Sequence, residues 1–489
     1  MKHIRWIIAL LALSMLGSGC KKQVPDEYGQ LDEATRQERK HVNTFAWNVM
    51  DSYYLWRDEI ATALDQWKTW EEPIQKVADI RYKDAAGHDI DRWTLLTDDF
   101  AALTGGVSGH TRTFGMDFVL YYFDQTHTRI VAVVTYTAAG SPAAAAGLKR
   151  GDVIMTVDGL EMTGKNYQEI VGDRLFGGGT VRLSLSDGRS TSMTAVDMYE
   201  DPVHTVRILE RPDGKKVGYL HYTSFTLDSC EDLVTVFQDF VQAGIGDLVL
   251  DLRYNSGGYL ITEEVLASML APLSVVESGK VLFREVYNAR MAAELKEEPT
   301  CFSTGFKFKN GSREQNISTV GANLDLPRLY VLVTGSSASA SESLICCLRP
   351  YMDVILIGEQ TSGKYCAGYL LAAENWYSAV RESLGEEEYK KALPYVSNWG
   401  IYVMYSRYAD CNGVTLSMPD GIAPDYEGED NPLDGFALGD PKETMLAVAL
   451  GLIDGRTRSA EALSGSGPVL DPVQAGFHPR TSGLLVGRY

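Results

Sequence analysis

Residues 329–364, LYVLVTGSSASASESLICCLRPYMDVILIGEQTSGK, decide the fold of the second half of this chain. The stretch begins with an apolar run, passes through a serine-rich turn into a helical pattern at residues 340–351, and returns to an apolar run at residues 354–357. A strand, a helix and a strand within about 30 residues form a right-handed βαβ unit with parallel strands. Residues 248–252 are a further near-continuous apolar run, as buried central strands require. The sequence therefore predicts an α/β fold.

The serine-rich turn, residues 334–342, lies between a predicted strand and a predicted helix. A serine there stands at the carboxyl edge of the sheet and at the positive end of the helix, and both favour developing negative charge. This pattern is typical of a nucleophile. The alternative is structural, because serine clusters also cap helices through backbone hydrogen bonds alone.

Lys364 follows the next strand, in the loop GEQTSGK at residues 358–364, and is predicted at the same sheet edge as the serines. A lysine beside a strand-end serine suits the base of a Ser–Lys dyad. A free lysine has a pKa of about 10.4, so the dyad needs a lowering of about three units, equivalent to about 4 kcal/mol. Burial in an apolar crevice supplies such a shift. A solvated loop lysine is the alternative interpretation.

A third motif, DLRYNSGG at residues 251–258, follows another predicted central strand. Gly257 and Gly258 lack a Cβ, so their backbone N–H groups can point into a crevice as an oxyanion hole requires. Alone, the motif also fits an ordinary turn. Three strand-end motifs that meet at one sheet edge predict an active site there.

These residues resemble the C-terminal processing peptidases, also called tail-specific proteases. Five stretches match in order: residues 217–220, 251–258, 337–342, 358–364 and 421–425. The resemblance implies a serine peptidase whose core has a central sheet of the crotonase-like type. It implies Ser339 as nucleophile, Lys364, 25 residues later, as base, and the backbone of Ala340 with Gly257 or Gly258 as oxyanion donors.

The resemblance also implies a PDZ-like, β-rich domain ahead of the protease core. Residues 140–154, GSPAAAAGLKRGDVI, look like the stretch that leads into a PDZ core strand. Phe114, Gly115 and Met116 are the expected carboxylate-binding loop, where backbone N–H groups hold the terminus of a peptide that adds as a strand. The alternative is a β-rich packing domain with a degenerate groove.

One position departs from the family pattern. Many members have a glutamine four residues beyond the lysine, where it orients the ammonium group, and Gly368 stands there in this chain. The residues from there to about 398 resemble an insertion. The residue that orients Lys364 is therefore open, and a catalytically degenerate, peptide-binding lipoprotein is a second hypothesis. An α/β-hydrolase esterase is disfavoured because the chain has no G-x-S-x-G elbow.

The amino terminus predicts export. A basic start, MKHIR, an apolar stretch at residues 6–16 and small residues before Cys20 are typical of a secretory signal. Cys20 after small residues resembles the lipobox of bacterial lipoproteins, although Leu16 is one place further from the cysteine than usual. We expect a periplasmic or outer-membrane lipoprotein anchored through Cys20. An ordinary signal peptide is the alternative.

Composition narrows the classes of partner. The 45 Lys and Arg against 65 Asp and Glu give a formal charge of −20, which disfavours nucleic-acid binding. Internal apolar runs are too short to span a bilayer. We expect polypeptide substrates and no cofactor or metal. Of the cysteines after Cys20, Cys346 and Cys347 are expected to be buried thiols, and Cys366 with Cys411 is the disulfide pair to test first.

The predicted organisation is a multi-domain α/β protein with a helical unit at its amino end. The expected units are a signal peptide (1–19), a tether (20–38), an N-terminal helical domain (39–105), a PDZ-like domain (106–204), a serine protease core (205–455) and a C-terminal tail (456–489).

Overall fold

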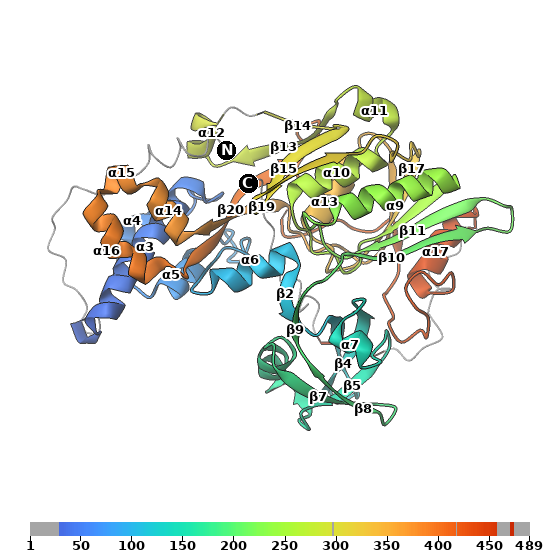
Figure 1. The fold of residues 1–489 in the computed structure, drawn as a ribbon, viewed down its shortest axis with the longest axis horizontal. Helices are drawn as coiled ribbons and strands as arrows, with labels where there is room; N and C mark the ends of the chain where they lie inside the picture. The colour runs from blue at the N-terminus through green and yellow to red at the C-terminus, as the bar shows by residue number, and fades with distance from the viewer. Residues whose placement is uncertain (1–28, 296–297, 417, 457–469, 474–489) are drawn as a thin grey trace.

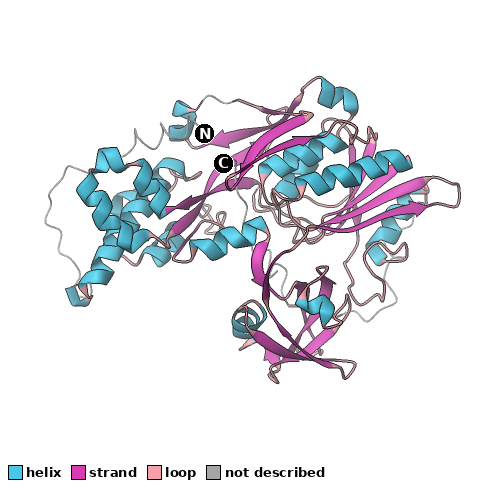
Figure 2. Ribbon diagram, viewed as in Figure 1, coloured by secondary structure: helices cyan, strands magenta, loops and turns pink. Residues whose placement is uncertain are grey.

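The structure is a computed structural model, and it describes residues 29–295, 298–416, 418–456 and 470–473. The predicted signal peptide and Cys20 lie outside the described residues, as does most of the predicted tail. Figures 1 and 2 show a helix-rich end, a mixed α/β centre and a smaller β-rich unit that projects from the centre. Across the described ranges, no helix has the length and apolar character needed to cross a membrane.

A six-stranded sheet forms the centre of the protein. Its first pair is antiparallel and the remaining strands are parallel. In spatial order its strands are β10 (Val203–Glu210), β11 (Lys216–Tyr222), β12 (Asp247–Asp251), β17 (Arg328–Val333), β18 (Asp353–Gly358) and β21 (Tyr426–Glu427). Helix α13 (Ala340–Leu348) connects β17 to β18 and completes the predicted βαβ unit.

Helices cover both faces of this sheet, which explains why its strands are apolar without alternation. On β12, Leu248 and Leu250 belong to the large core, whereas Val249 belongs to a second core that packs against α17 (Thr444–Ile453). The large core includes residues of α9 (Cys230–Ala243), α10 (Leu260–Leu270) and α13.

A second sheet is built around the long strand β20 (Gly400–Ala409), which pairs with three of its other strands. These are β1 (Leu95–Thr97), β13 (Val281–Tyr287), which also pairs with β14 (Thr300–Cys301), and β19 (Cys366–Ala372). The helix α3 (Glu33–Tyr53) packs against α14 (Ala373–Ala379), α16 (Glu386–Val396) and β20. The amino-terminal helices and the apparent insertion therefore form one layer and share a continuous core with the centre.

The remaining elements of the central and amino-terminal parts are short. They are the helices α4 (Ala61–Gln66), α5 (Pro73–Ile80), α6 (Phe100–Ser108), α11 (Leu273–Glu277), α12 (Ala289–Glu294) and α15 (Arg381–Leu384), and the hairpin β15 (Gly305–Asn310) with β16 (Arg313–Ser318).

The projecting unit is a β-sheet with a hydrophobic core of its own. It contains β3 (Met116–Tyr122), β4 (Arg129–Thr137), β5 (Val153–Val157), β6 (Met162–Thr163), β7 (Thr180–Leu185) and β8 (Ser190–Thr194), with the helices α7 (Pro142–Ala145), α8 (Tyr167–Glu169) and η1 (Ile170–Leu175). A ribbon of β2 (His110–Thr113) and β9 (Val196–Tyr199) joins this unit to the rest.

The outer edge of β3 is occupied by the chain's own carboxyl-terminal region. Strand β22 (Asp471–Pro472) pairs antiparallel with Tyr121 and Tyr122, and the Val473 N–H donates to the Leu120 carbonyl at 2.9 Å. Val473 is 6% exposed and belongs to the core of the β-rich unit. Because the pairing is antiparallel, the segment runs along β3 toward the loop at residues 113–116.

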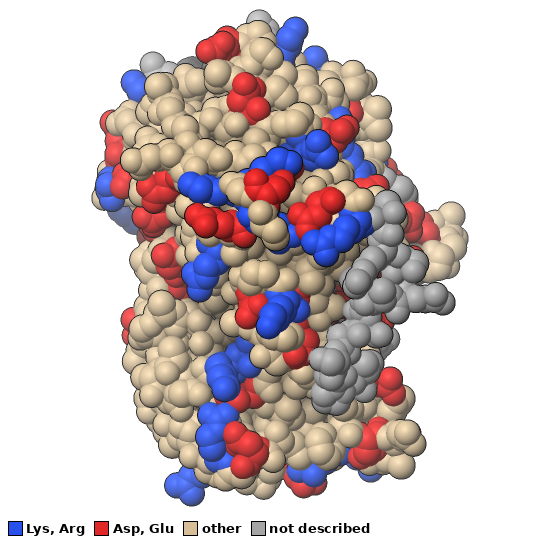
Figure 3. Space-filling view, turned by 90° about the vertical axis from the view of Figure 1, so that its right-hand side faces the viewer, with Lys and Arg blue, Asp and Glu red and all other residues tan. Residues whose placement is uncertain are grey.

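The charges are mixed on the face that Figure 3 shows, where basic and acidic side chains alternate over the surface. That face has no continuous basic patch of the kind that tracks a phosphate backbone.

Candidate active site

Ser339 stands at the junction of β17 and α13, in a strained backbone conformation. Its φ is +56°, a left-handed value that non-glycine residues rarely adopt and that is often found at functional sites. The side chain is fully buried, and its Oγ donates to the Cys366 carbonyl at 3.4 Å. The serine hydroxyl thus points to the strand that follows Lys364.

Glu342, in the first turn of α13, ties the serine to the lysine loop. One carboxylate oxygen accepts the N–H groups of Ser339 (2.8 Å) and Lys364 (2.9 Å). The other accepts the Thr361 hydroxyl and the Gly363 N–H at 2.5 and 2.8 Å. Burial raises the pKa of Glu342, and the hydrogen bonds from Thr361 and the backbone act against that shift.

Lys364 lies in an apolar, fully buried environment. Its Nζ donates to the Tyr402 hydroxyl at 3.1 Å and lies 5.4 Å from the ring centroid of Trp93. Desolvation lowers the pKa of Lys364 to about 7, against smaller opposing effects of Cys366, Asp91 and Glu342. A lysine with this pKa is about half neutral near pH 7, which is the state a general base needs.

The glycine motif lies against the serine turn. The Asn255 carbonyl accepts the Ala338 N–H at 3.1 Å and the Ser341 hydroxyl at 3.0 Å, while the Ser337 hydroxyl donates to Leu252 at 2.8 Å. Ser337 and Ser341 thus hold the two segments together. The three motifs predicted to converge at one sheet edge do so.

One predicted oxyanion donor is engaged elsewhere. The Gly257 N–H donates to the Asn255 side-chain oxygen at 2.8 Å, so in this conformation it does not serve the crevice as the sequence suggested. Gly258 has φ +147° and packs so closely that a Cβ would lie 2.3 Å from the Phe225 carbonyl oxygen. Gly258 and Ala340 therefore remain as the candidate donors.

Trp93 and Tyr402 were not identified from the sequence as site residues. Trp93 comes from the amino-terminal region and Tyr402 from β20, far from Lys364 along the chain. The Arg92 guanidinium also donates to the Ser362 carbonyl at 3.1 Å. No motif spacing marks these residues, because only the packing of the second sheet brings them to the lysine.

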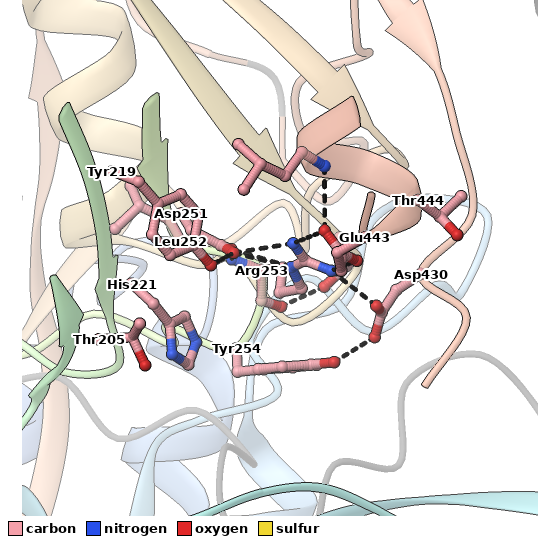
Figure 4. Close-up of polar contacts among 12 residues, drawn as sticks. Thr205, Tyr219, His221, Asp251, Leu252, Arg253, Tyr254, Asp430, Glu443 and Thr444 are labelled. Carbon is pink, nitrogen blue, oxygen red and sulfur yellow. Dashed lines mark hydrogen bonds and ion pairs between the residues drawn. The ribbon is translucent and has the colours of Figure 1, made fainter. Parts of the chain in front are cut away.

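A network of buried charges connects the glycine motif to the β-rich unit, and Figure 4 shows the part of it around Arg253. Arg253 forms ion pairs with Asp251 (2.8 Å) and Glu443 (2.7 Å), and both partners are fully buried. Asp430 forms ion pairs with Arg253 at 2.8 Å and with Arg150, which belongs to the β-rich unit, at 2.6 Å. Burial alone would raise the pKa of Asp430, but the two guanidinium groups outweigh it and hold that pKa well below its usual range.

The predicted carboxylate-binding loop lies at the start of β3. Gly115 has φ +68°, its N–H donates to the Thr113 hydroxyl at 2.9 Å, and a Cβ there would overlap Ser141. Phe114 and Met116 are buried, at 2% and 3% exposure. The loop is therefore closely packed against residues 138–143, with the edge of β3 beside it.

The six described cysteines are free. Cys366, predicted near a loop, is instead buried in β19 with its sulfur 3.4 Å from that of Met404, so it is not disulfide-bonded to Cys411 here. Cys347 is buried and Cys346 partly so. Among the residues that the structure describes, no group of three or more His, Cys, Asp or Glu side chains could hold a metal ion.

Comparison with known proteins agrees with this geometry. Residues 216–428 match peptidase family S41. The carboxyl-terminal-processing protease of Picosynechococcus sp. is 27% identical over 230 residues, which cover 46% of this chain and 49% of that protein. A Staphylococcus aureus protein described as a CtpA-like serine protease is 27% identical over 270 residues, 55% of this chain and 48% of its own. The chain thus spans about half the length of these curated relatives.

A solved structure from Bacteroides fragilis, assigned to the S41 proteases, matches with a TM-score of 0.62 and 25% identity. The match covers 84% of this chain and 97% of that one. The predicted multi-domain α/β fold is therefore confirmed. The predicted resemblance to the C-terminal processing peptidases is confirmed as well, by the S41 match and by the name of the Picosynechococcus relative.

Proposed function

We propose that this chain is a serine endopeptidase with a Ser339–Lys364 dyad that cleaves unfolded or C-terminally exposed polypeptides in the cell envelope. The observation that carries the proposal is a fully buried lysine with a pKa of about 7, tied through Glu342 to a strained serine at a strand end. The match of residues 216–428 to peptidase family S41 supports it.

In this mechanism Ser339 Oγ attacks the scissile carbonyl carbon while neutral Lys364 takes the hydroxyl proton. The N–H groups of Gly258 and Ala340 stabilise the oxyanion. The lysine then gives its proton to the leaving amine, and the C–N bond breaks to leave an acyl-enzyme. Water attacks the ester with Lys364 again acting as base, which restores the serine.

The described conformation is a closed one. Ser339 and Lys364 are both fully buried, so a polypeptide reaches them only after the crevice opens. Closure itself serves the chemistry, because exclusion of water is what lowers the lysine pKa.

The β-rich unit is proposed to capture chain ends as a PDZ-like domain. Phe114, Gly115 and Met116 precede the β3 edge, where a peptide adds as an antiparallel strand. The pairing of β22 with this edge supports the proposal, because it shows that the edge accepts an extended segment. Export and lipidation of Cys20 would place the enzyme at a membrane surface.

The central test is proteolysis of a fluorescently labelled, unstructured protein by the parent and by Ser339→Ala. We expect the variant, shown by circular dichroism to be folded, to lose at least 99% of the activity. Equal rates for the two proteins would reject the dyad.

A second candidate is a peptide-binding protein without protease activity, which the absence of a glutamine at Gly368 and the burial of Ser339 favour. A fluorophosphonate probe separates the two. Labelling that requires Ser339 supports the peptidase, whereas peptide binding without labelling supports the second candidate.

A further inference from the structure

Gly368 and Tyr402 fit together beside the lysine. Gly368 lies in β19 and Tyr402 in the adjacent strand β20. A Cβ at residue 368 would lie 2.5 Å from ring carbons of Tyr402 and 2.5 Å from the Met404 methyl group. The tyrosine ring thus occupies the space that any side chain at residue 368 would need.

This position brings the phenol to the amine. The Lys364 Nζ donates to the Tyr402 hydroxyl at 3.1 Å, and it lies 5.1 Å from the ring centroid. Both side chains are buried. Strand β20 is held from both sides, since Tyr402 is in register with Leu95 of β1 and Leu370 of β19. The phenol is therefore anchored by the sheet and not by a loop.

We propose that Tyr402 is the positioning residue of Lys364, and that Gly368 is a glycine because it must admit the Tyr402 ring. The proposal rests on the Ser–Lys dyad proposed above. The phenolic oxygen accepts one amine hydrogen, which holds the Lys364 nitrogen at the position from which it would take the Ser339 proton. After proton transfer the same contact becomes a charge-assisted hydrogen bond to the ammonium group.

The first test is Tyr402→Phe, which keeps the ring and removes the hydroxyl. We expect kcat to fall 10- to 100-fold with KM changed less than threefold, because the loss concerns proton transfer and not peptide binding. The hydroxyl stabilises the charged lysine more than the neutral one. Its removal therefore lowers the lysine pKa further, and the acidic limb of the kcat/KM profile moves to lower pH.

The matched control is Tyr405→Phe, on the same strand. Tyr405 is also buried and donates to Glu285 at 2.6 Å, away from Lys364. We expect it to leave the acidic limb in place, whatever its effect on stability. Loss of activity in Tyr402→Phe without a shift of the limb would indicate a structural role and overturn the proposal, as would unchanged kcat.

A compensation experiment tests the role of Gly368. We expect Gly368→Ala to displace the Tyr402 ring and to reproduce the loss of kcat. In a Tyr402→Ala background, Gly368→Gln places an amide oxygen in the vacated space, and we expect it to recover at least tenfold in kcat over Tyr402→Ala alone. Absence of both effects would overturn the assignment of Gly368.

Failure of this inference is distinguishable from failure of the proposed function. If Ser339→Ala remains active, the dyad itself is wrong. If Ser339→Ala is inactive while Tyr402→Phe matches the parent in kcat and pH profile, only the positioning role is wrong. Titration of ¹³C-labelled Lys364 by NMR reports the same shift without any assay of activity.

Discussion

The carboxylate of Glu342 accepts the backbone N–H of Lys364 at 2.9 Å, and the accepting oxygen also receives the N–H of Ser339. One buried acid therefore fixes the backbone of both proposed catalytic residues. In the sequence this glutamate is only the end of a serine-rich motif. In the structure it lies in the first turn of α13, and its two hydrogen bonds fix the position of Ser339 relative to Lys364.

Glu342→Gln is expected to damage both stability and activity. The glutamine amide offers one acceptor oxygen in place of two and directs its NH₂ at a backbone donor, so a buried N–H loses its partner. We expect the free energy of unfolding to fall by about 2 kcal/mol and kcat to fall at least tenfold. Urea denaturation and peptidase assays measure the two effects. Glu374→Gln, at an exposed position of α14, is the control and should change neither.

The pH profile should follow the titration of Lys364. Its pKa of about 7 means that the proposed base is protonated, and therefore inactive, in acid and becomes neutral as the pH rises through 7. We expect kcat/KM to increase with a slope of one below a midpoint near pH 7 and to level off above it. A midpoint above pH 9 would show that the lysine is solvated, contrary to the burial seen here.

Lys364→Met should show how much the burial of the amine lowers the free energy of unfolding, which is measured by urea denaturation at several pH values and needs no assay of activity. In the parent, the folded-state pKa lies below the unfolded value, so the unfolded chain binds more protons between about pH 7 and 10.5 and stability rises across that window. The methionine has no such dependence. We expect the variant to be more stable at pH 7, by on the order of 3–5 kcal/mol, with the difference shrinking toward pH 10. A difference independent of pH would contradict this explanation.

The local chemistry of the site was predictable because it follows strands that are unmistakable in the sequence. Runs such as residues 248–252 and 329–333 are apolar without alternation, and each is followed directly by the motif that enters the crevice. Parallel neighbours bring their carboxyl ends to one edge of the sheet, so the sequence alone predicts Ser339 and Lys364 at that edge.

The walls of the crevice were not predictable, since they depend on tertiary packing. Trp93 belongs to no motif in the sequence, and Tyr402 lies in β20, which pairs with β1 from the distant amino-terminal region. The sequence predicts a helical domain at residues 39–105, but it does not show that buried side chains of this region share one core with the centre. The sequence also does not show that the Gly257 N–H donates to the Asn255 side chain and is therefore not directed at the crevice.

Arg150→Met should weaken the attachment of the β-rich unit. The Arg150 side chain is buried and forms an ion pair with Asp430. Its removal leaves the buried Asp430 carboxylate with one guanidinium partner, Arg253, in place of two. We expect the free energy of unfolding to fall by about 3 kcal/mol. Arg174→Met is the control, because the Arg174 pair with Asp158 is partly exposed and worth less than about 1 kcal/mol. If the two substitutions lower the thermal stability equally, the buried ion pair of Arg150 contributes no more to stability than the partly exposed pair of Arg174.

Release of β22 should open the β3 edge to peptides. Val473 is buried in the β-rich core, and Asp471 contacts His127 at 2.9 Å. In the full-length chain, Val473→Asp introduces a charge at this buried position and so disfavours the pairing. We expect a fluorescent peptide carrying residues 468–475 to bind the variant at least tenfold more tightly than the parent, measured by fluorescence anisotropy. Val320→Asp, at a valine that is 68% exposed, should bind like the parent. Equal affinities for all three proteins would mean that β22 does not compete for this edge.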